Sequence, residues 1–172
     1  LQDMGAVFGL NCGWEHPLWF ADEPGVQETN GFTRQNWFEP VGREVQMLRD
    51  QVGVIDISNF ANYEVAGPGS QVWLDQIMAN RIPAEIGRSC LTPLIGVRGG
   101  VAGDFTVTKT AEDRYMVIGS GMAERYHQRF FNMVELPEGT TFTVKTDAIC
   151  GYNVAGPKSR DMLQRLTNDD LS

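Results

Sequence analysis

One twelve-residue pattern occurs twice in this chain of 172 residues, and it constrains the fold more than any other feature. The segment YEVAGPGSQVWL begins at Tyr63 and YNVAGPKSRDML begins at Tyr152, with seven of the twelve positions identical and no gap. Each copy joins an apolar stretch typical of a strand to a Gly-Pro turn and then to the start of a helix. Such self-similarity indicates a duplicated structural unit, with Leu74 and Leu163 expected to be buried alike.

The two copies are not equally complete. The first is followed by a strand pair joined at Gly99-Gly100, a third strand, YMVIGS, and a helix, whereas the sequence ends shortly after the helix of the second. We therefore predict an α+β fold with antiparallel sheets and packed helices, built on a duplicated strand-turn-helix unit whose second copy is truncated. The expected limits are an aromatic-rich, irregular lead-in at 1–40, the first half of the domain at 41–148, and the start of the second half at 149–172, so that the chain is a fragment.

The segment after residue 40 has the periodicity of an amphipathic helix. Its apolar positions fall on one stripe, at Val41, Val45, Leu48 and Val52. Gly53 follows at the position typical of a C-terminal glycine cap, which predicts that the helix ends there.

Composition excludes several classes of function. A net charge of −8 disfavours binding to nucleic acid or to an anionic membrane, because like charges repel. Cys12, Cys90 and Cys150 are scattered and form no CxxC pair, which indicates reduced thiols inside a cell. The expected location is a bacterial cytoplasm or the mitochondrial matrix. His16 and His127 lack a second histidine or cysteine at ligand spacing, so no metal site is predicted and both histidines are interpreted as structural.

One strand carries an acid where none is needed for folding. Alternation along VAGDFTVT predicts a core face made of Val101, Gly103, Phe105 and Val107, and an opposite face made of Ala102, Asp104, Thr106 and Thr108. The second face suits either open solvent or the wall of a wet cavity. Periodicity alone favours solvent, since one-sided sheets commonly have such a face.

Five segments together resemble a known family. In order they are CGWEHPLWF, NWFEPVGREVQMLRDQVGVIDIS, YEVAGPGSQVWLDQIMANRIP, RGGVAGDFTV and VAGPKSRDMLQRLTNDDLS. They resemble the folate-binding, aminomethyltransferase-like domain at the C-terminal end of dimethylglycine and sarcosine dehydrogenases. The NWFEPVG and VAGP…LQRLT…DLS pieces distinguish these dehydrogenases from the glycine-cleavage T-protein, a more distant relative.

The resemblance implies a role for Asp104. The T-protein pattern at this hairpin is Gly-Gly-x-x-Asp-Asp, and its second acid, the functional one, matches Asp104, whereas the first is replaced by Gly103. A carboxylate fixed on a strand can stabilise a cationic one-carbon centre and accept the proton that is released when a folate nitrogen captures it. The resemblance thus favours a cavity acid over a solvated one.

Other folate contacts implied by the resemblance are changed in this chain. Phe60 stands in place of a methionine that packs on the folate in the family. Two family tyrosines that line the pocket are replaced by Leu91 and Thr108. Ile118 and Gly119 lie at the strand end that meets the pterin, where Gly119 replaces an asparagine. The expected site is therefore Asp104 as the catalytic and cofactor-binding acid, with Phe60, Leu91, Ile118 and Gly119 as further cofactor contacts.

Two functions follow from these residues. The leading one is the tetrahydrofolate-binding part of a flavin-dependent N-methyl amine dehydrogenase, which captures the one-carbon unit as 5,10-methylenetetrahydrofolate. FAD is then expected only in an upstream domain, and the partners are folate, the one-carbon unit and the remainder of the same chain, without nucleic acid or membrane. The alternative is a non-catalytic scaffold or assembly domain, favoured by the changes at Leu91, Thr108 and Gly119 and opposed by Asp104.

Overall fold

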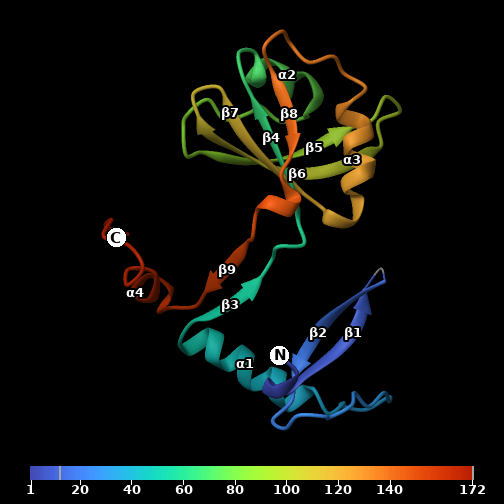
Figure 1. Ribbon diagram of the computed structural model, residues 1–172, viewed down its shortest axis with the longest axis vertical. Coiled ribbons are helices and arrows are strands. Elements are labelled where there is room, and N and C mark those ends of the chain that lie inside the picture. The colour runs from blue at the N-terminus through green and yellow to red at the C-terminus, as the bar shows by residue number, and fades with distance from the viewer. Residues whose placement is uncertain (12, 172) are drawn as a thin grey trace. The chain divides into compact units, whose positions relative to one another are not determined.

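The computed structural model describes residues 1–11 and 13–171 (Figure 1). Cys12 lies outside the described residues. The chain forms two compact units, one from Leu1–Ile55 with Asn153–Ser172 and the other from Asp56–Tyr152, and each is described separately. The limits predicted for the lead-in and the two halves describe a duplicated domain, whereas these two units are defined by their compactness. The predicted limits therefore stay a prediction.

The second unit is built on a five-stranded antiparallel sheet. Its strand order is β5-β6-β7-β4-β8, with every neighbouring pair antiparallel. The strands are β4 (Ala61–Ala66), β5 (Ser89–Ile95), β6 (Val101–Ala111), β7 (Arg114–Gly119) and β8 (Thr141–Val144), and the helices are α2 (Ser70–Ile77) and α3 (Glu124–Phe131), with short 3-10 helices at Gly121–Ala123 and Thr146–Ala148. The mixed α+β class with antiparallel strands is as predicted.

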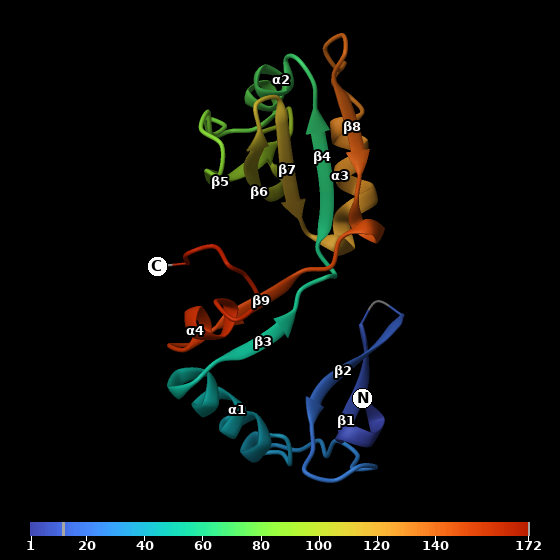
Figure 2. The same ribbon diagram turned by 60° about the vertical axis from the view of Figure 1, so that its left-hand side comes forward.

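Both helices pack on one face of this sheet. Trp73 and Leu74 from α2 and Phe131 from α3 join a single buried cluster with Tyr63 of β4 and Phe105 of β6. Their side chains are at most 2% exposed, and burial of each contributes roughly 1.5–3 kcal/mol. Figures 1 and 2 show α2 and α3 beside the strands that they cover. We call this helix-covered side the inner face and the opposite side the outer face.

The predicted hairpin between β5 and β6 is confirmed. Gly99 has a φ of 79°, and the turn is closed by hydrogen bonds from Gly96 N to Gly100 O and from Gly99 N to Gly96 O, both 2.8 Å. A residue with a side chain is strained in this left-handed region, which explains why a glycine stands there. Strand β6 begins directly after this turn, at Val101.

The alternation predicted for β6 is correct only beyond its first two residues. Phe105 and Val107 are buried on the inner face, and Asp104 and Thr106 are exposed on the outer face. At the start of the strand the prediction was wrong, because Ala102 is buried and Val101 is 67% exposed. The reason is a register shift at Ile95, which pairs with Val101 after Leu94 has paired with Gly103. A bulge of this kind reverses which side chains face the core.

Both copies of the repeated pattern form strand, turn and helix. In the first copy, Gly67 has a φ of 116° and its carbonyl accepts a hydrogen bond from Ser70 N; in the second, Gly156 has a φ of 122° and accepts one from Ser159 N, at 3.1 Å in both cases. The local structures agree, and the duplication itself stays a prediction. The expectation of equal burial was wrong: Leu74 is fully buried, whereas Leu163 is only half-buried.

Replacing Gly67 with alanine should destabilise the second unit strongly. A methyl carbon there would lie 2.2 Å from the carbonyl oxygen of Gly139, in a backbone conformation that is itself unfavourable. The matched control is Gly99→Ala, which has the same sign of φ but open space around it. We expect Gly67→Ala to cost about 1–3 kcal/mol more than the control, the usual scale of overpacking. Equal losses in urea unfolding would show that collision with Gly139 does not matter.

The first unit contains a β-hairpin where an irregular lead-in was predicted. After a short 3-10 helix at Gln2–Met4, β1 (Ala6–Asn11) pairs with β2 (Trp14–Phe20) in antiparallel fashion. Val7, Trp19 and Ala21 form a small buried cluster, against which Trp37 and Val41 pack. The expectation of irregular structure was wrong, because the two segments pair as strands despite the Gly and Pro residues that they contain.

Helix α1 (Phe38–Asp50) follows, and it ends before its predicted cap. Gln51 is the C-cap, and Gly53 starts β3 (Gly53–Asp56) instead of capping the helix. Gly53 has no positive φ; a side chain there would lie 2.7 Å from Leu48 Cδ2, so close packing explains the glycine. Strand β3 pairs with β9 (Tyr152–Ala155), which leads into α4 (Ser159–Leu163), as Figure 2 shows.

Candidate functional site

The outer face of the five-stranded sheet carries the predicted catalytic acid. The backbone alternates so that one row across the strands consists of Leu91, Thr106, Ile118 and Asn62, each opposite the next. Asp104 lies one step along β6 from Thr106 on this face and is paired with Pro93 of β5. Neither α2 nor α3 contacts this face, because both helices join the inner cluster.

Asp104 is exposed, and its carboxylate has no hydrogen-bond or ion-pair partner among residues 1–11 and 13–171. A central strand with two paired neighbours holds its backbone rigidly. A free carboxylate on such a strand can accept a proton or stabilise a nearby positive charge. The exposed position agrees with the solvated face favoured by periodicity alone.

The predicted apolar contacts Leu91, Ile118 and Phe60 differ in how exposed they are and in where they lie relative to Asp104. Leu91 is 66% exposed and Ile118 is half-buried; they flank Thr106 from the two neighbouring strands. Phe60 lies just before β4, is 42% exposed, and accepts a hydrogen bond at its carbonyl from the Asn62 side chain at 2.9 Å. Leu91 and Ile118, with Thr106 between them, thus form a mostly apolar strip beside the acid, and Phe60 lies at the end of β4.

Gly119 is placed differently. Its α-carbon faces the inner side of the sheet, where an added side chain would lie 2.6 Å from the Phe105 ring and 3.3 Å from His127. The structure therefore does not bring Gly119 to the outer face with Asp104. Thr108, where a family tyrosine is absent, does lie on the outer face, and its hydroxyl lies 2.7 Å from that of Ser89.

His127 of α3 lies directly behind the strand that carries Asp104. Its ring is 2% exposed and packs edge-on against Phe105, with the ring centroids 4.6 Å apart. Its Nδ1 atom is 3.4 Å from the hydroxyl oxygen of Tyr63, whose proton is donated to the carbonyl of Glu124 at 3.3 Å. Sequence reasoning interpreted this histidine as structural. No signal in the sequence placed it behind Asp104, because that contact is made only by the packing of α3 on the sheet.

Protonation of His127 opposes folding. Burial lowers the pKa of His127, and the Asp104 carboxylate partly counteracts this shift by favouring the charged ring. The unfolded chain therefore binds the proton more tightly, since a free histidine has a pKa of about 6.5. The contribution of His127 to stability is complete above that pH and is lost as the pH falls below it.

This linkage gives a testable pH dependence. The free energy of unfolding, measured in urea from about pH 8 to about pH 5, should fall more steeply in the wild type than in His127→Gln, by up to about 1.4 kcal/mol per pH unit. In Asp104→Asn the pKa of His127, followed by NMR, should drop further, because the carboxylate no longer favours the imidazolium. Parallel stability curves for wild type and His127→Gln would contradict the assignment.

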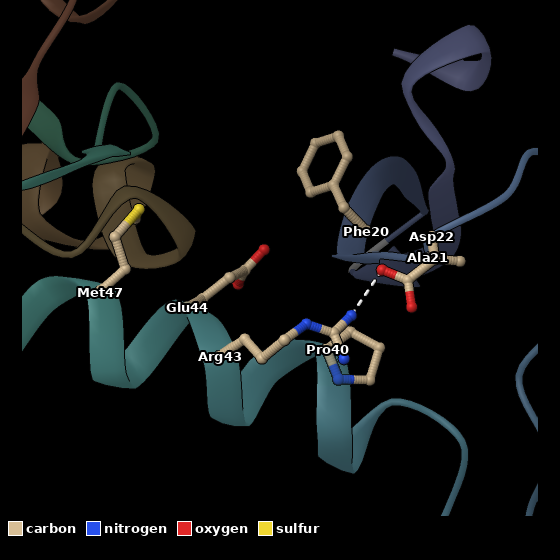
Figure 3. Close-up of a pocket in the computed structure, with 7 residues that line it drawn as sticks. All are labelled: Phe20, Ala21, Asp22, Pro40, Arg43, Glu44 and Met47. Atoms are coloured by element: carbon tan, nitrogen blue, oxygen red, sulfur yellow. Dashed lines mark hydrogen bonds and ion pairs between the residues drawn. The ribbon is translucent and has the colours of Figure 1, made fainter.

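A separate cleft lies in the first unit (Figure 3). It measures about 420 Å³ and lies between β2 and α1, lined among others by Phe20, Pro40 and Met47. Arg43 of α1 forms an ion pair with Asp22, and both side chains are largely exposed. Such a pair contributes at most about 1 kcal/mol. The cleft contains none of the residues predicted for the site.

The described residues contain neither a metal-binding group of side chains nor a membrane-spanning helix. Across residues 1–11 and 13–171, no group of three His, Cys, Asp or Glu side chains is arranged to hold a metal ion. Over the same residues, every helix is too short or too polar to span a bilayer. Cys90 and Cys150 are both free thiols.

The arrangement of strands and helices is that of an aminomethyltransferase. The structure aligns with glycine cleavage system aminomethyltransferase T from Bartonella henselae with a TM-score of 0.71, covering 94% of this chain and 40% of that one. The two sequences are 21% identical, so this similarity establishes the fold and confirms the predicted α+β class.

Sequence comparison specifies the family. The model described as "GCVT N-terminal domain" matches residues 1–172, and the chain belongs to this family. The mitochondrial dimethylglycine dehydrogenase of Mus musculus is 35% identical over 168 residues, which are 95% of this chain and 19% of that protein. The 4-methylaminobutanoate oxidase (formaldehyde-forming) of Paenarthrobacter nicotinovorans is 29% identical over 174 residues, which are 100% of this chain and 21% of that protein. The chain thus spans about one fifth of the length of these relatives, and the resemblance noted from its motifs is confirmed.

Proposed function

We propose that this chain is the tetrahydrofolate-binding part of a flavin-dependent N-methyl amine dehydrogenase, and that Asp104 is its catalytic acid. Two observations together support the proposal: the sequence similarity to a dimethylglycine dehydrogenase and the position of Asp104 on the sheet. The chain is 35% identical to a dimethylglycine dehydrogenase over nearly its whole length, and it keeps a free carboxylate on a rigid strand. FAD belongs to another part of the intact protein, and we assign it no contact in this chain.

The chemical types of the side chains on the outer face suit the binding of a folate. A folate offers a flat ring system with N–H donors, which suits an apolar strip next to a hydrogen-bond acceptor. Leu91 and Ile118 supply the strip, and Asp104 supplies the acceptor. Phe60 adds a further exposed aromatic surface at the end of β4. Gly119 faces the inner side, so its contribution on this proposal is to the packing behind the site.

The chemistry assigned to Asp104 is electrostatic and proton-accepting. Tetrahydrofolate, when bound, supplies the nucleophilic nitrogen that takes up the one-carbon unit from the oxidised amine. Asp104 would stabilise the positive charge of the incoming iminium and accept the proton that a folate nitrogen loses as its C–N bond to the one-carbon unit forms. The original C–N bond would break as the second folate nitrogen bonds to the same carbon, and the departing amine would take up the released protons. Its short side chain on a paired strand limits the motion of the carboxylate, which favours a fixed orientation.

Product analysis of the intact protein tests this proposal. N-methyl amines such as dimethylglycine and sarcosine are oxidised with and without tetrahydrofolate, and both formaldehyde and 5,10-methylenetetrahydrofolate are measured. We expect methylenetetrahydrofolate to form at the expense of formaldehyde, and faster than free formaldehyde and tetrahydrofolate condense in the absence of the protein. Formaldehyde release that does not change when tetrahydrofolate is added would refute the folate function. One relative is named a formaldehyde-forming oxidase, so formaldehyde is the product to measure beside methylenetetrahydrofolate.

A second candidate is a non-catalytic scaffold or assembly domain. It is favoured by the open position of Asp104 and by Leu91 and Thr108, which lack the hydroxyls of the family's tyrosines. The two candidates differ in ligand binding. Calorimetry of the intact protein with tetrahydrofolate should show saturable binding that weakens in Leu91→Asp if the enzyme function holds, and no binding in either form if the domain is only a scaffold.

A further inference from the structure

The imidazole of His127 and the ring of Phe105 together fill the space left by two glycines behind the Asp104 strand. A side-chain carbon added at Gly103 would lie 2.6 Å from Nε2 of His127, and one added at Gly119 would lie 3.3 Å from its Cε1 atom. The two glycines come from adjacent strands, β6 and β7, and His127 comes from α3. Gly103 immediately precedes Asp104, so the ring rests on the backbone that carries the carboxylate.

The imidazole is held from three directions. The ring of Phe105 lies edge-on to it from the same strand, and the hydroxyl of Tyr63 lies 3.4 Å from Nδ1, from β4. Tyr126 and the rest of α3 back it from the helix side. A buried ring with contacts to three elements cannot move without displacing one of them, since protein interiors are close-packed.

We propose that His127 is a positioning residue for Asp104. Its ring contacts Gly103 and is held in place by Tyr63. It thereby fixes the position and orientation of the β6 backbone at Asp104, whose carboxylate projects from the other face of the sheet. The inference rests on the proposed function of Asp104 and adds to it the part that holds the acid in place. Displacement of a catalytic group by about 1 Å can cost as much as about 100-fold in rate, so a support of this kind has a measurable effect on chemistry.

Two substitutions separate the two ends of the imidazole. In His127→Gln the amide reaches the position of Nε2 against Gly103, whereas in His127→Asn it reaches only the position of Nδ1 near Tyr63. Tyr63→Phe keeps the buried ring and removes the hydroxyl that anchors the imidazole. All three are made in the intact protein, and formation of methylenetetrahydrofolate is measured per active site, counted as flavin reduced by the amine.

We expect kcat for folate-dependent capture to fall about tenfold in His127→Asn and about threefold or less in His127→Gln, with Tyr63→Phe between them. The KM for tetrahydrofolate should change little, because Leu91 and Ile118 are untouched on the outer face. A residue that only fills space would lower the melting temperature and leave kcat per active site unchanged. Since Tyr63→Phe removes a single oxygen atom, it remains informative if His127→Asn fails to fold.

The outcome separates this inference from the function on which it rests. Asp104→Asn is measured in the same series. If it captures the one-carbon unit normally, Asp104 is not the acid, and both proposals fall. If Asp104→Asn is impaired while His127→Asn, His127→Gln and Tyr63→Phe all keep the wild-type kcat, only the positioning role of His127 is overturned.

Discussion

Replacing Asp104 with asparagine should lower folate-dependent capture of the one-carbon unit by about two orders of magnitude or more, the usual scale for loss of a positioned acid or base. The substitution keeps the shape of the side chain and removes its charge. Because Asp104 is exposed and unpaired, its loss should change the free energy of unfolding by less than about 0.5 kcal/mol. A fall in rate without a fall in stability is what distinguishes a functional carboxylate from a structural one.

The measurement is the rate at which the intact protein forms 5,10-methylenetetrahydrofolate, with released formaldehyde as the complementary product. The matched control is Asp113→Asn, the same chemical change at an exposed residue in the turn between β6 and β7. We expect the control to behave as wild type and Asp104→Asn to divert the one-carbon unit to formaldehyde. Wild-type formation of methylenetetrahydrofolate in both variants would mean that Asp104 is only a solvated strand residue.

Truncation of Phe131 to alanine should cause the largest loss of stability, about 3–5 kcal/mol. Phe131 is 2% exposed, and its ring lies within 6.1 Å, centroid to centroid, of four other aromatic rings, those of Tyr63, Trp73, Phe105 and Phe142. Alanine would leave a cavity between α3 and the sheet, which such a rigid cluster can close only in part.

Chemical denaturation followed by circular dichroism measures this effect. Phe32→Ala makes the same chemical change at a fully exposed side chain and should cost less than about 0.5 kcal/mol. A loss below about 1 kcal/mol for Phe131→Ala would contradict the packing described for the inner face, because no large buried side chain is removed at so small a cost.

Local sequence signals predicted several elements correctly for reasons that act over a few residues. Gly99 and Gly100 predicted the hairpin because a tight turn needs a left-handed residue, and Gly99 has that conformation. Alternation from Gly103 to Thr108 predicted the two faces of β6, because side chains of a strand alternate. The repeat predicted two strand-turn-helix segments, and both are present.

The errors arose where a distant contact decides the outcome. Gly53 was interpreted as a helix cap, yet it is required by the approach of Leu48 to the backbone. Val101 and Ala102 exchanged faces because of a bulge that depends on the pairing of β5. The resemblance grouped Gly119 with Asp104 as a cofactor contact; its α-carbon faces the other side of the sheet, and its role in cofactor binding stays a prediction.

By itself, the sequence determined the fold class, the family and the placement of an acid on a strand face, since these depend on periodicity, turn chemistry and motifs that are local in the chain. Only the tertiary structure decided what lies behind that acid. His127 is 23 residues beyond Asp104 in the chain and has no motif around it. The packing of α3 brings its ring against Gly103 and Gly119, because two missing side chains on adjacent strands leave a space that the imidazole shares with the ring of Phe105.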